Sequence, residues 1–201
     1  VMSLSTYDGL KVSVADWLNR EDLTSVIPSF IELAENRIFH ELRAPINEKT
    51  ADLTLGSDGY ATIPSDYLEV KDLFWNYTPL SRVYLTQLHS YAERTAVAPE
   101  YFAREQAKFR VFPIPTQVTG DTLRMIYYFT PPNLSATSAT NSIFQTAPEL
   151  YLYGTLVEAA NYLGSDSSRW EGAYQSSMGR ALQHAKSSEY AGASSQVQLG
   201  Y

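Results

Sequence analysis

Residues 26–43, VIPSFIELAENRIFHELR, decide how the N-terminal part of the chain folds. Their apolar residues recur at spacings of three and four, which places them on one side of a helix. These residues are Ile27, Phe30, Ile31, Ala34, Ile38 and Leu42. Three acidic residues are expected on or beside the other side: Glu32, Glu35 and Glu41. Pro28 suits the first turn, where its missing N–H has no helical partner, and Ser25 is the expected N-cap. The stretch predicts an amphipathic helix that packs one face into a core.

A second helix is predicted just before this one. Residues 7–18 carry an apolar stripe, with Thr6 or Asp8 as the cap and a polar break at 19–22. The stripe consists of Leu10, Val14, Trp17 and Leu18. The following helix runs over 23–43 and ends before Pro45. A short link of this kind predicts two antiparallel helices.

From residue 46 the spacing of apolar residues changes from about 3.6 to 2, which is typical of strands. The predicted elements are a hairpin of 51–55 and 60–64 around the turn 56–59, a strand at 67–75, a turn at 76–79, a short helix at 85–94, a turn at 99–104, and a closing hairpin of 108–112 with 122–129. This segment therefore predicts an antiparallel β sub-domain.

Helices resume after a polar linker at 134–141. One helix is predicted at 147–163, with Gly164 as its C-cap, and another at 167–189. The order of elements predicts an α+β protein with an antiparallel bundle of about four helices, an inserted antiparallel β sub-domain and an extended C-terminal tail. The expected boundaries are 1–45 and 142–189 for the bundle, 46–133 for the β sub-domain and 190–201 for the tail.

The tail, YAGASSQVQLGY, is not expected to fold by itself. Ordering its backbone would require about 12–24 kcal/mol, whereas burial of Val197, Leu199 and Tyr201 recovers only about 5–9 kcal/mol. The alternation in QVQLGY suits addition to the edge of a partner's sheet. The tail is therefore either a docking strand or a frayed terminus.

Composition excludes several classes of function. The 201 residues contain no cysteine, so disulfides and cysteine-based metal sites are absent, and a formal charge of −7 opposes general affinity for nucleic acid. No apolar run is long enough to cross a membrane, and the first residues lack the pattern of a signal peptide. We expect a soluble protein made in the cytoplasm. The 15 tyrosines indicate amphipathic surface that becomes covered.

The sequence contains no convincing reactive centre. His40, His89 and His184 lack a second histidine at ligand spacing, so no metal site is expected, and no glycine-rich phosphate loop indicates a cofactor. Two pairs of acidic residues leave a peptidoglycan hydrolase as an alternative: Glu32 with Glu35, and Asp66 with Glu69. The aromatic strands at 67–75 and 122–129 leave an aromatic-rich ligand-binding β module as another, although alternation directs about half of their aromatics into the core.

An ordered set of motifs carries a resemblance to a known family. The set includes IPSFIELAENRI at 27–38, IPSDYLEVKDL at 63–73, KFRVFPIP at 108–115 and PELYLYGTLVEAA at 148–160. In this order the chain resembles the head-to-tail adaptor proteins of tailed bacteriophages, over about residues 10–182. No single motif is diagnostic, and the residues after Ser188 lie outside the resemblance.

The resemblance implies a structural virion protein rather than an enzyme. Its copies would form a ring, usually of twelve, under the portal vertex, where the ring extends the DNA channel and offers a platform for the tail. The implied partners are the portal protein, tail or nozzle proteins and further copies of the chain. DNA would pass without specific binding, and no membrane is involved. The implied location is the virion neck, with assembly in the host cytoplasm.

Two sets of residues become candidates for these contacts. The side of the 26–43 helix away from the core predicts a subunit interface of Glu32, Asn36, Phe39 and Arg43. The tail predicts a portal-docking set of Tyr190, Val197, Leu199 and Tyr201. Phe39 is the most informative of these residues, because a large aromatic off the apolar stripe must be covered. If its own subunit covers it, the neighbour contact has to lie elsewhere.

Overall fold

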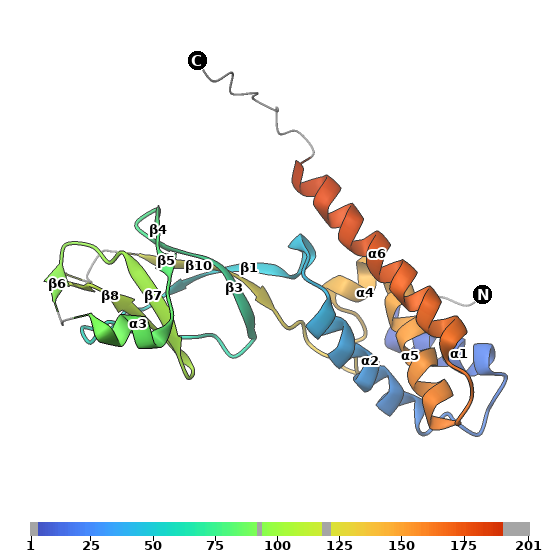
Figure 1. The fold of residues 1–201 in the computed structure, drawn as a ribbon. Coiled ribbons are helices and arrows are strands. Elements are labelled where there is room, and N and C mark those ends of the chain that lie inside the picture. The colour runs from blue at the N-terminus through green and yellow to red at the C-terminus, as the bar shows by residue number, and fades with distance from the viewer. Residues whose placement is uncertain (1–3, 92–93, 118–121, 191–201) are drawn as a thin grey trace, which may run out of the picture. The chain divides into compact units, whose positions relative to one another are not determined.

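The computed structural model of the chain describes residues 4–91, 94–117 and 122–190, the last seven of these by their backbone alone. Contacts divide the chain into two compact units (Figure 1). The helical unit comprises Val1–Asn47 and Pro131–Tyr201, and the β unit comprises Glu48–Thr130. Helices and largely antiparallel sheets occur together, so the predicted α+β class is confirmed.

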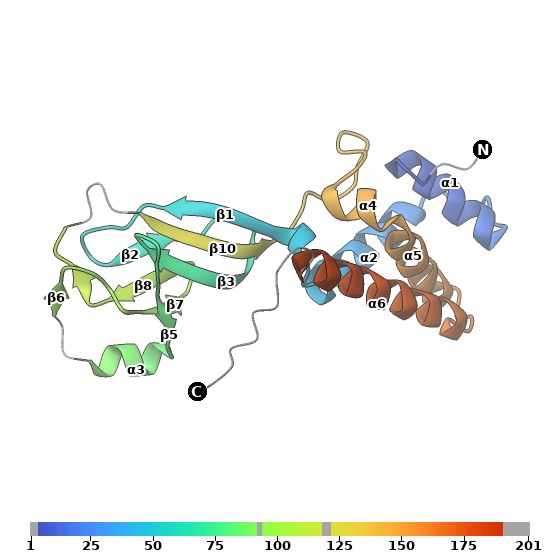
Figure 2. The ribbon, with the colours of Figure 1, turned by 90° about the horizontal axis from the view of Figure 1, so that it is seen from above.

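The helical unit is arranged around one apolar helix. Its elements are α1 Tyr7–Leu18, α2 Ile27–Glu41, the 3-10 helix η1 Pro45–Asn47, α4 Ser142–Thr146, α5 Pro148–Tyr162 and α6 Ser168–Tyr190. Helix α5 contacts α1, α2, α4 and α6, and these neighbours surround it in Figure 2. Nine of its fifteen residues are buried. A helix that is apolar on most sides requires such cover.

Helix α2 presents the predicted face to the core. All six predicted apolar positions are at most 5% exposed. The expected cap at Ser25 is wrong, because the turn starts earlier. The amide N–H groups of Val26 and Ile27 both donate to the Leu23 carbonyl, at 2.9 and 3.0 Å. Val26 therefore occupies the cap position with helical backbone angles and without a side-chain acceptor.

Other helix ends follow their sequence signals. Helix α1 has the predicted bounds, and the Thr6 hydroxyl accepts the Gly9 N–H at 3.1 Å. Helix α5 ends at Tyr162 with Leu163 as its C-cap, and the next residue, Gly164, has a φ of +64° that favours glycine. The Gly164 and Ser165 N–H groups donate to Asn161 and Ala160, at 3.2 and 3.0 Å. This pair of bonds is the Schellman motif, in which Gly164 directly follows the C-cap Leu163, so the predicted glycine stop is present one residue after the cap.

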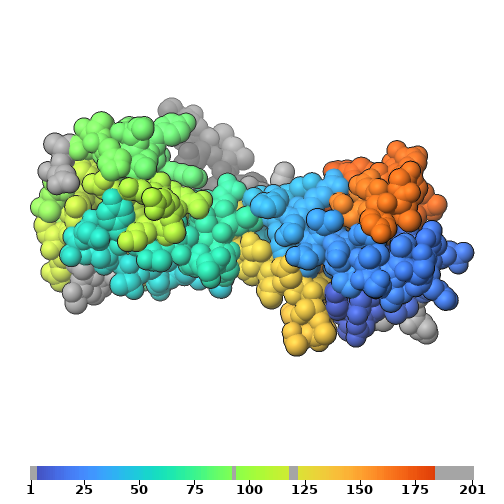
Figure 3. Space-filling model, turned by 90° about the horizontal axis from the view of Figure 1, so that it is seen from below, coloured from blue at the N-terminus to red at the C-terminus, as the bar shows by residue number. Residues whose placement is uncertain are grey.

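Helices α2, α5 and α6 meet at a close contact. A Cβ added to Gly154 would lie 3.1 Å from the Ala34 Cβ and 3.4 Å from the Tyr174 ring. Beside this contact, Arg37 donates two hydrogen bonds to Glu171, at 2.8 and 2.5 Å, and its guanidinium lies over the Tyr174 ring. The guanidinium lowers the pKa of the Glu171 carboxyl to about 2. The missing side chain of Gly154 and the ion pair of Arg37 with Glu171 together hold α2 close to α6. The surfaces of α2 and α6 adjoin in Figure 3.

The β unit contains two four-stranded sheets. Its elements are β1 Glu48–Leu53, β2 Tyr60–Thr62, β3 Tyr67–Trp75, β4 Thr78–Pro79, β5 Ser81–Arg82, α3 Leu85–Ser90, β6 Thr95–Ala96, β7 Tyr101–Glu105, β8 Lys108–Phe112, β9 Ile114–Pro115 and β10 Leu123–Phe129. One sheet has the order β1-β10-β3-β4, and the other has the order β2-β8-β7-β5. Figure 2 shows β1, β10 and β3 side by side. The pairs β5–β7 and β6–β9 are parallel.

Two predicted hairpins are wrong in their strand partners. Strand β1 pairs with β10, and β2 pairs with β8, so the turn at 56–59 closes only one bridge, between Leu55 and Ala61. Strands β8 and β10 belong to different sheets. The predicted turn at 99–104 contains most of β7. Apolar alternation marks a strand but does not select its partner.

The two sheets bury one shared apolar cluster. It includes Leu73 and Trp75 of β3, Phe102 of β7 and Phe109 of β8. Tyr127 of β10 is 1% exposed, and its hydroxyl donates to Asp66 at 2.9 Å. Packing between the sheets therefore selects the strand pairing.

Replacement of Gly154 by valine tests the close contact among α2, α5 and α6. Added methyl groups would press on Ala34 and Tyr174, so we expect Gly154→Val to lower the free energy of unfolding by about 2–3 kcal/mol in urea titrations. Gly172→Ala is the matched control, because a Cβ there meets nothing within 4 Å. This control should gain about 0.5–1 kcal/mol from helix propensity. Equal urea midpoints for Gly154→Val and the wild type would contradict the contact.

Candidate functional site

The predicted subunit interface on α2 divides into two parts. Glu32 and Asn36 are exposed, and Leu33 between them is 52% exposed. Phe39 is only 3% exposed and belongs to the core of its own chain. Its place in the predicted interface is therefore wrong, because the ring packs within its own helical unit. Any neighbour contact on α2 has to use the side that carries Glu32 and Leu33.

Arg43 has a structural role in its own chain. Its Nη1 donates to the carbonyl oxygens of Phe39 and Leu42, at 3.0 and 3.3 Å. Both carbonyls lie at the end of α2, where backbone acceptors lack helical partners. Arg43 therefore caps the helix, and its assignment to a subunit contact remains a prediction.

The predicted portal-docking residues are not described by the structure. Val197, Leu199 and Tyr201 lie outside the described residues, and Tyr190 is described only as the last backbone position of α6. Their assignment remains a prediction from the sequence.

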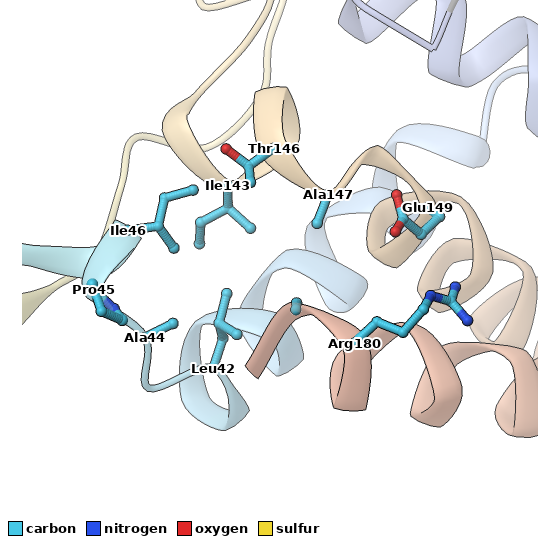
Figure 4. A pocket seen from close by; sticks show the side chains of 10 residues that line it. Leu42, Ala44, Pro45, Ile46, Ile143, Thr146, Ala147, Glu149 and Arg180 are labelled. Carbon is cyan, nitrogen blue, oxygen red and sulfur yellow. The ribbon is translucent and has the colours of Figure 1, made fainter. Parts of the chain in front are cut away.

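A pocket of about 310 Å³ opens on the helical unit (Figure 4). It is lined by residues of the segment after α2 and of α4, α5 and α6: Leu42, Ala44, Pro45, Ile46, Ile143, Thr146, Ala147, Glu149, Arg180 and Ala181. Three of these are alanines, whose small side chains leave the space between the helices open. The sequence did not predict this site, because no helix was expected between the linker at 134–141 and the helix at 147–163, where α4 lies.

The pocket is apolar with a charged rim. Leu42 and Ile143, at 1% and 0% exposure, belong to the core that forms its floor. Glu149 and Arg180 lie together on one side of it in Figure 4. Arg180 donates to the Ser176 and Ser177 hydroxyls, at 3.0 and 2.8 Å. Such a pocket can receive an apolar side chain but has no reactive group.

The polar linker predicted at 134–141 does connect β10 to α4, and in addition hydrogen bonds hold it to the helical unit. The Leu134 N–H donates to Glu35 Oε1 at 2.8 Å, and the Leu134 side chain is 6% exposed. Asn141 accepts from the Tyr151 hydroxyl and the Phe144 N–H, at 3.0 and 2.9 Å. Figure 3 shows the segment in yellow beside the blue surface of the N-terminal helices. The polar composition of this segment did not indicate that Leu134 and Asn141 are buried.

Glu35 was predicted on or beside the polar side of α2, and it is instead 1% exposed. Burial raises the pKa of its carboxyl to about 7, against the opposing effect of the Leu134 N–H. A raised pKa beside Glu32 is what a hydrolase would need from a general acid. Glu35 is, however, buried and bonded to the chain's own backbone, which gives it an anchoring role.

The other candidates for chemistry also have structural partners. Asp66 accepts from Lys49 Nζ and from the Tyr127 hydroxyl, at 2.6 and 2.9 Å. His89 Nδ1 lies 2.9 Å from Arg110 Nη1. His40 is exposed, and the side chain of His184 is not described. In the part of the chain that the structure describes, no three acidic or histidine side chains form a group that could hold a metal.

The aromatic strands of the β unit mostly supply core. Trp75 and Tyr127 are 4% and 1% exposed, which agrees with the predicted inward half of the aromatics. The strongly exposed tyrosines are Tyr77 and Tyr84, at 87% and 82%, and both lie outside the two strands. Across the described residues, no helix is both long and apolar enough to cross a bilayer.

A family model described as SU10 adaptor protein matches residues 5–198 of the chain. The match therefore spans both the helical unit and the β unit. No curated protein matches the chain.

Glu35→Gln tests the anchoring role, because glutamine keeps an oxygen for the Leu134 N–H and removes the charge. With a folded pKa of about 7 against an ordinary 4.5, the folded state binds more protons between these values. The wild type therefore loses stability as the pH rises from about 4.5 to 7. We expect the variant to match the wild type at pH 4 and to be more stable at pH 8, by up to about 3 kcal/mol. Urea titrations at both pH values measure this difference.

Glu32→Gln is the control, because Glu32 is exposed on the same helix and its replacement should change the pH profile little. Identical pH profiles for Glu35→Gln and the wild type would contradict the anchoring role. A peptidoglycan zymogram completes the test, since clearing by the wild type that Glu35→Gln abolishes would instead indicate a catalytic carboxylate.

Proposed function

The chain belongs to the SU10 adaptor protein family of phage head–tail adaptors, and from this premise we propose that it forms the ring between the portal vertex and the tail. In this role it is a structural, non-enzymatic protein of the virion neck that assembles in the host cytoplasm. The observation that carries the proposal is the family match over residues 5–198, because it spans both units rather than one motif.

We assign separate roles to the parts of the chain. The four-helix bundle, residues 1–45 and 142–189, packs against ring neighbours and borders the DNA channel. The inserted β sub-domain, residues 46–133, reaches tail or nozzle proteins, and the tail at 190–201 docks on the portal. The chain divides into its two compact units after residues 47 and 130, which supports separate roles for the bundle and the β sub-domain. The pocket beside Ala181 also takes part in the portal contact, because α6 leads from this pocket to the C-terminal segment 190–201.

Charge is compatible with a DNA channel. Twelve copies at −7 each carry 12 × −7 = −84. Acidic walls would repel DNA, and neutral walls would not attract it. Only charges within about 8 Å of DNA act strongly at physiological salt. We therefore propose an acidic or neutral lumen with Arg and Lys directed into subunit contacts. DNA then passes without specific binding.

Closed symmetry explains how modest contacts can build the ring. Each copy presents one patch to each neighbour, and docking on a preformed portal raises the effective concentration of every copy. The ring is therefore expected to form on the portal rather than in free solution.

Light scattering tests this order of assembly. We expect the purified chain to elute mainly as a 22.5 kDa monomer, because the separate contacts are weak without the portal. Addition of portal should shift it into a complex with about twelve copies. A stable ring of 12 × 22.5 = 270 kDa in the absence of portal would contradict portal-templated assembly.

Deletion of residues 190–201 tests the docking tail. We expect co-assembly with portal, observed by electron microscopy, to weaken or disappear, while circular dichroism keeps the signal of the folded chain. Replacement of Val197, Leu199 and Tyr201 by serine should have the same effect. Ser194→Ala with Ser195→Ala is the matched control in the same tail, and it should assemble normally. Unchanged portal binding after the deletion would eliminate this assignment.

A further inference from the structure

The β unit carries a hollow of about 550 Å³ that is bordered by two arginines. Arg82 lies on the edge strand β5, and Arg104 lies on its neighbour β7. The remaining lining residues come from the loop after β5 and from α3: Val83, Tyr84, Leu85 and Gln87. This hollow lies outside every site described above.

The register of the strands places both arginines on one side of the sheet. Arg82 is directly opposite Phe102, and Arg104 follows Phe102 by two residues. Side chains two apart on a strand share a face, and directly paired residues do so as well. The two guanidinium groups therefore belong to the same face, beside the hollow that both of them line.

The two arginines differ from most other cations of the chain in having no carboxylate partner. Seven of the other cations pair with a carboxylate: Lys11–Asp8, Arg20–Asp22, Arg37–Glu171, Lys49–Asp66, Lys71–Glu48, Arg94–Glu100 and Arg124–Asp52. Among the residues that the structure describes, Arg82 makes no hydrogen bond or ion pair. The Arg104 side chain donates to the Gln106 carbonyl, at 3.0 Å, and its guanidinium lies 5.2 Å from the centre of the Tyr67 ring. The chain has 22 acidic and 15 basic residues, so a shortage of carboxylates does not explain why these two arginines lack such a partner.

Tyr84 adds an aromatic side chain at the same place. Its side chain is 82% exposed, although a phenol ring of this size is usually covered. Tyr and Arg are the residue types that dominate the centres of protein interfaces. An exposed tyrosine that lines the same hollow as two arginines without a carboxylate partner is thus arranged for contact with another chain.

We propose that this hollow binds an acidic peptide segment of a partner protein, whose carboxylates pair with Arg82 and Arg104 and whose apolar atoms cover Tyr84. The planar guanidinium group donates two parallel hydrogen bonds to a carboxylate. DNA is the less suitable anion, because phosphate binding requires a larger group of Lys and Arg than these two, and the chain carries −7 overall. The proposal goes beyond the adaptor function and does not depend on it.

Nuclear magnetic resonance of the arginine side-chain N–H groups in the full chain tests the site. The probe is a ten-residue peptide of alternating Glu and Ala, with the corresponding Gln–Ala peptide as the neutral comparison. We expect the Glu peptide to shift the Arg82 and Arg104 signals saturably at 150 mM salt, and the Gln peptide to leave them unchanged. Each of Arg82→Ala and Arg104→Ala should weaken binding about tenfold.

Lys108→Ala is the matched control, because Lys108 lies on the same sheet but pairs with Glu105, on the face opposite Arg104. It removes one positive charge and should leave binding unchanged. A backbone amide spectrum of each variant confirms that the β unit is folded. Absence of shifts with the Glu peptide, equal weakening by Lys108→Ala, or tighter binding of a ten-base-pair DNA duplex would overturn the proposal.

Discussion

Helix α5 is apolar on most of its sides, and such a helix is stable in water only when other helices cover it. The requirement draws α1, α2, α4 and α6 onto it from both ends of the chain. Gly154 lets α2 and α6 approach α5 closely. The long β segment between α2 and α4 is therefore held at two points whose separation is set by helix packing. The return to the helices is fixed as well, because Glu35 and Asn141 anchor the segment after β10.

Charged groups have a supporting role in this arrangement. Arg37 joins α2 to α6 through Glu171, in a position where burial is partial and hydrogen bonds are short. Glu35 is the exception, because burial in the core raises the pKa of its carboxyl. This buried carboxyl is compensated in part because its oxygen accepts from the Leu134 N–H, which would otherwise be buried without a partner. Its chemistry resembles that of a catalytic acid, but its position makes it an anchor.

The family identity and the geometry together favour a protein that works through its surfaces. The described residues contain no group of three side chains that could hold a metal, and one member of each acidic pair, Glu35 and Asp66, has a structural partner. What remains on the surface is suited to contact: the exposed side of α2, the apolar pocket of the helical unit and the arginine-bordered hollow of the β unit. A protein of the phage neck is expected to carry several such surfaces, because it contacts different neighbours on different sides.

The sequence by itself determined helices α1, α2, α5 and α6, the strand at 67–75 and the six core positions of α2, because local periodicity and capping residues depend on neighbours in the chain. It also determined the family, through motifs that match in order. Only the tertiary structure decided which strands pair, since alternation selects a face but not a partner. It also decided that Phe39 and Glu35 are buried and that Arg82 and Arg104 lie together. Burial at such positions depends on segments far away in the sequence: Leu134 covers Glu35, and the pairing of β5 with β7 brings the two arginines to one face.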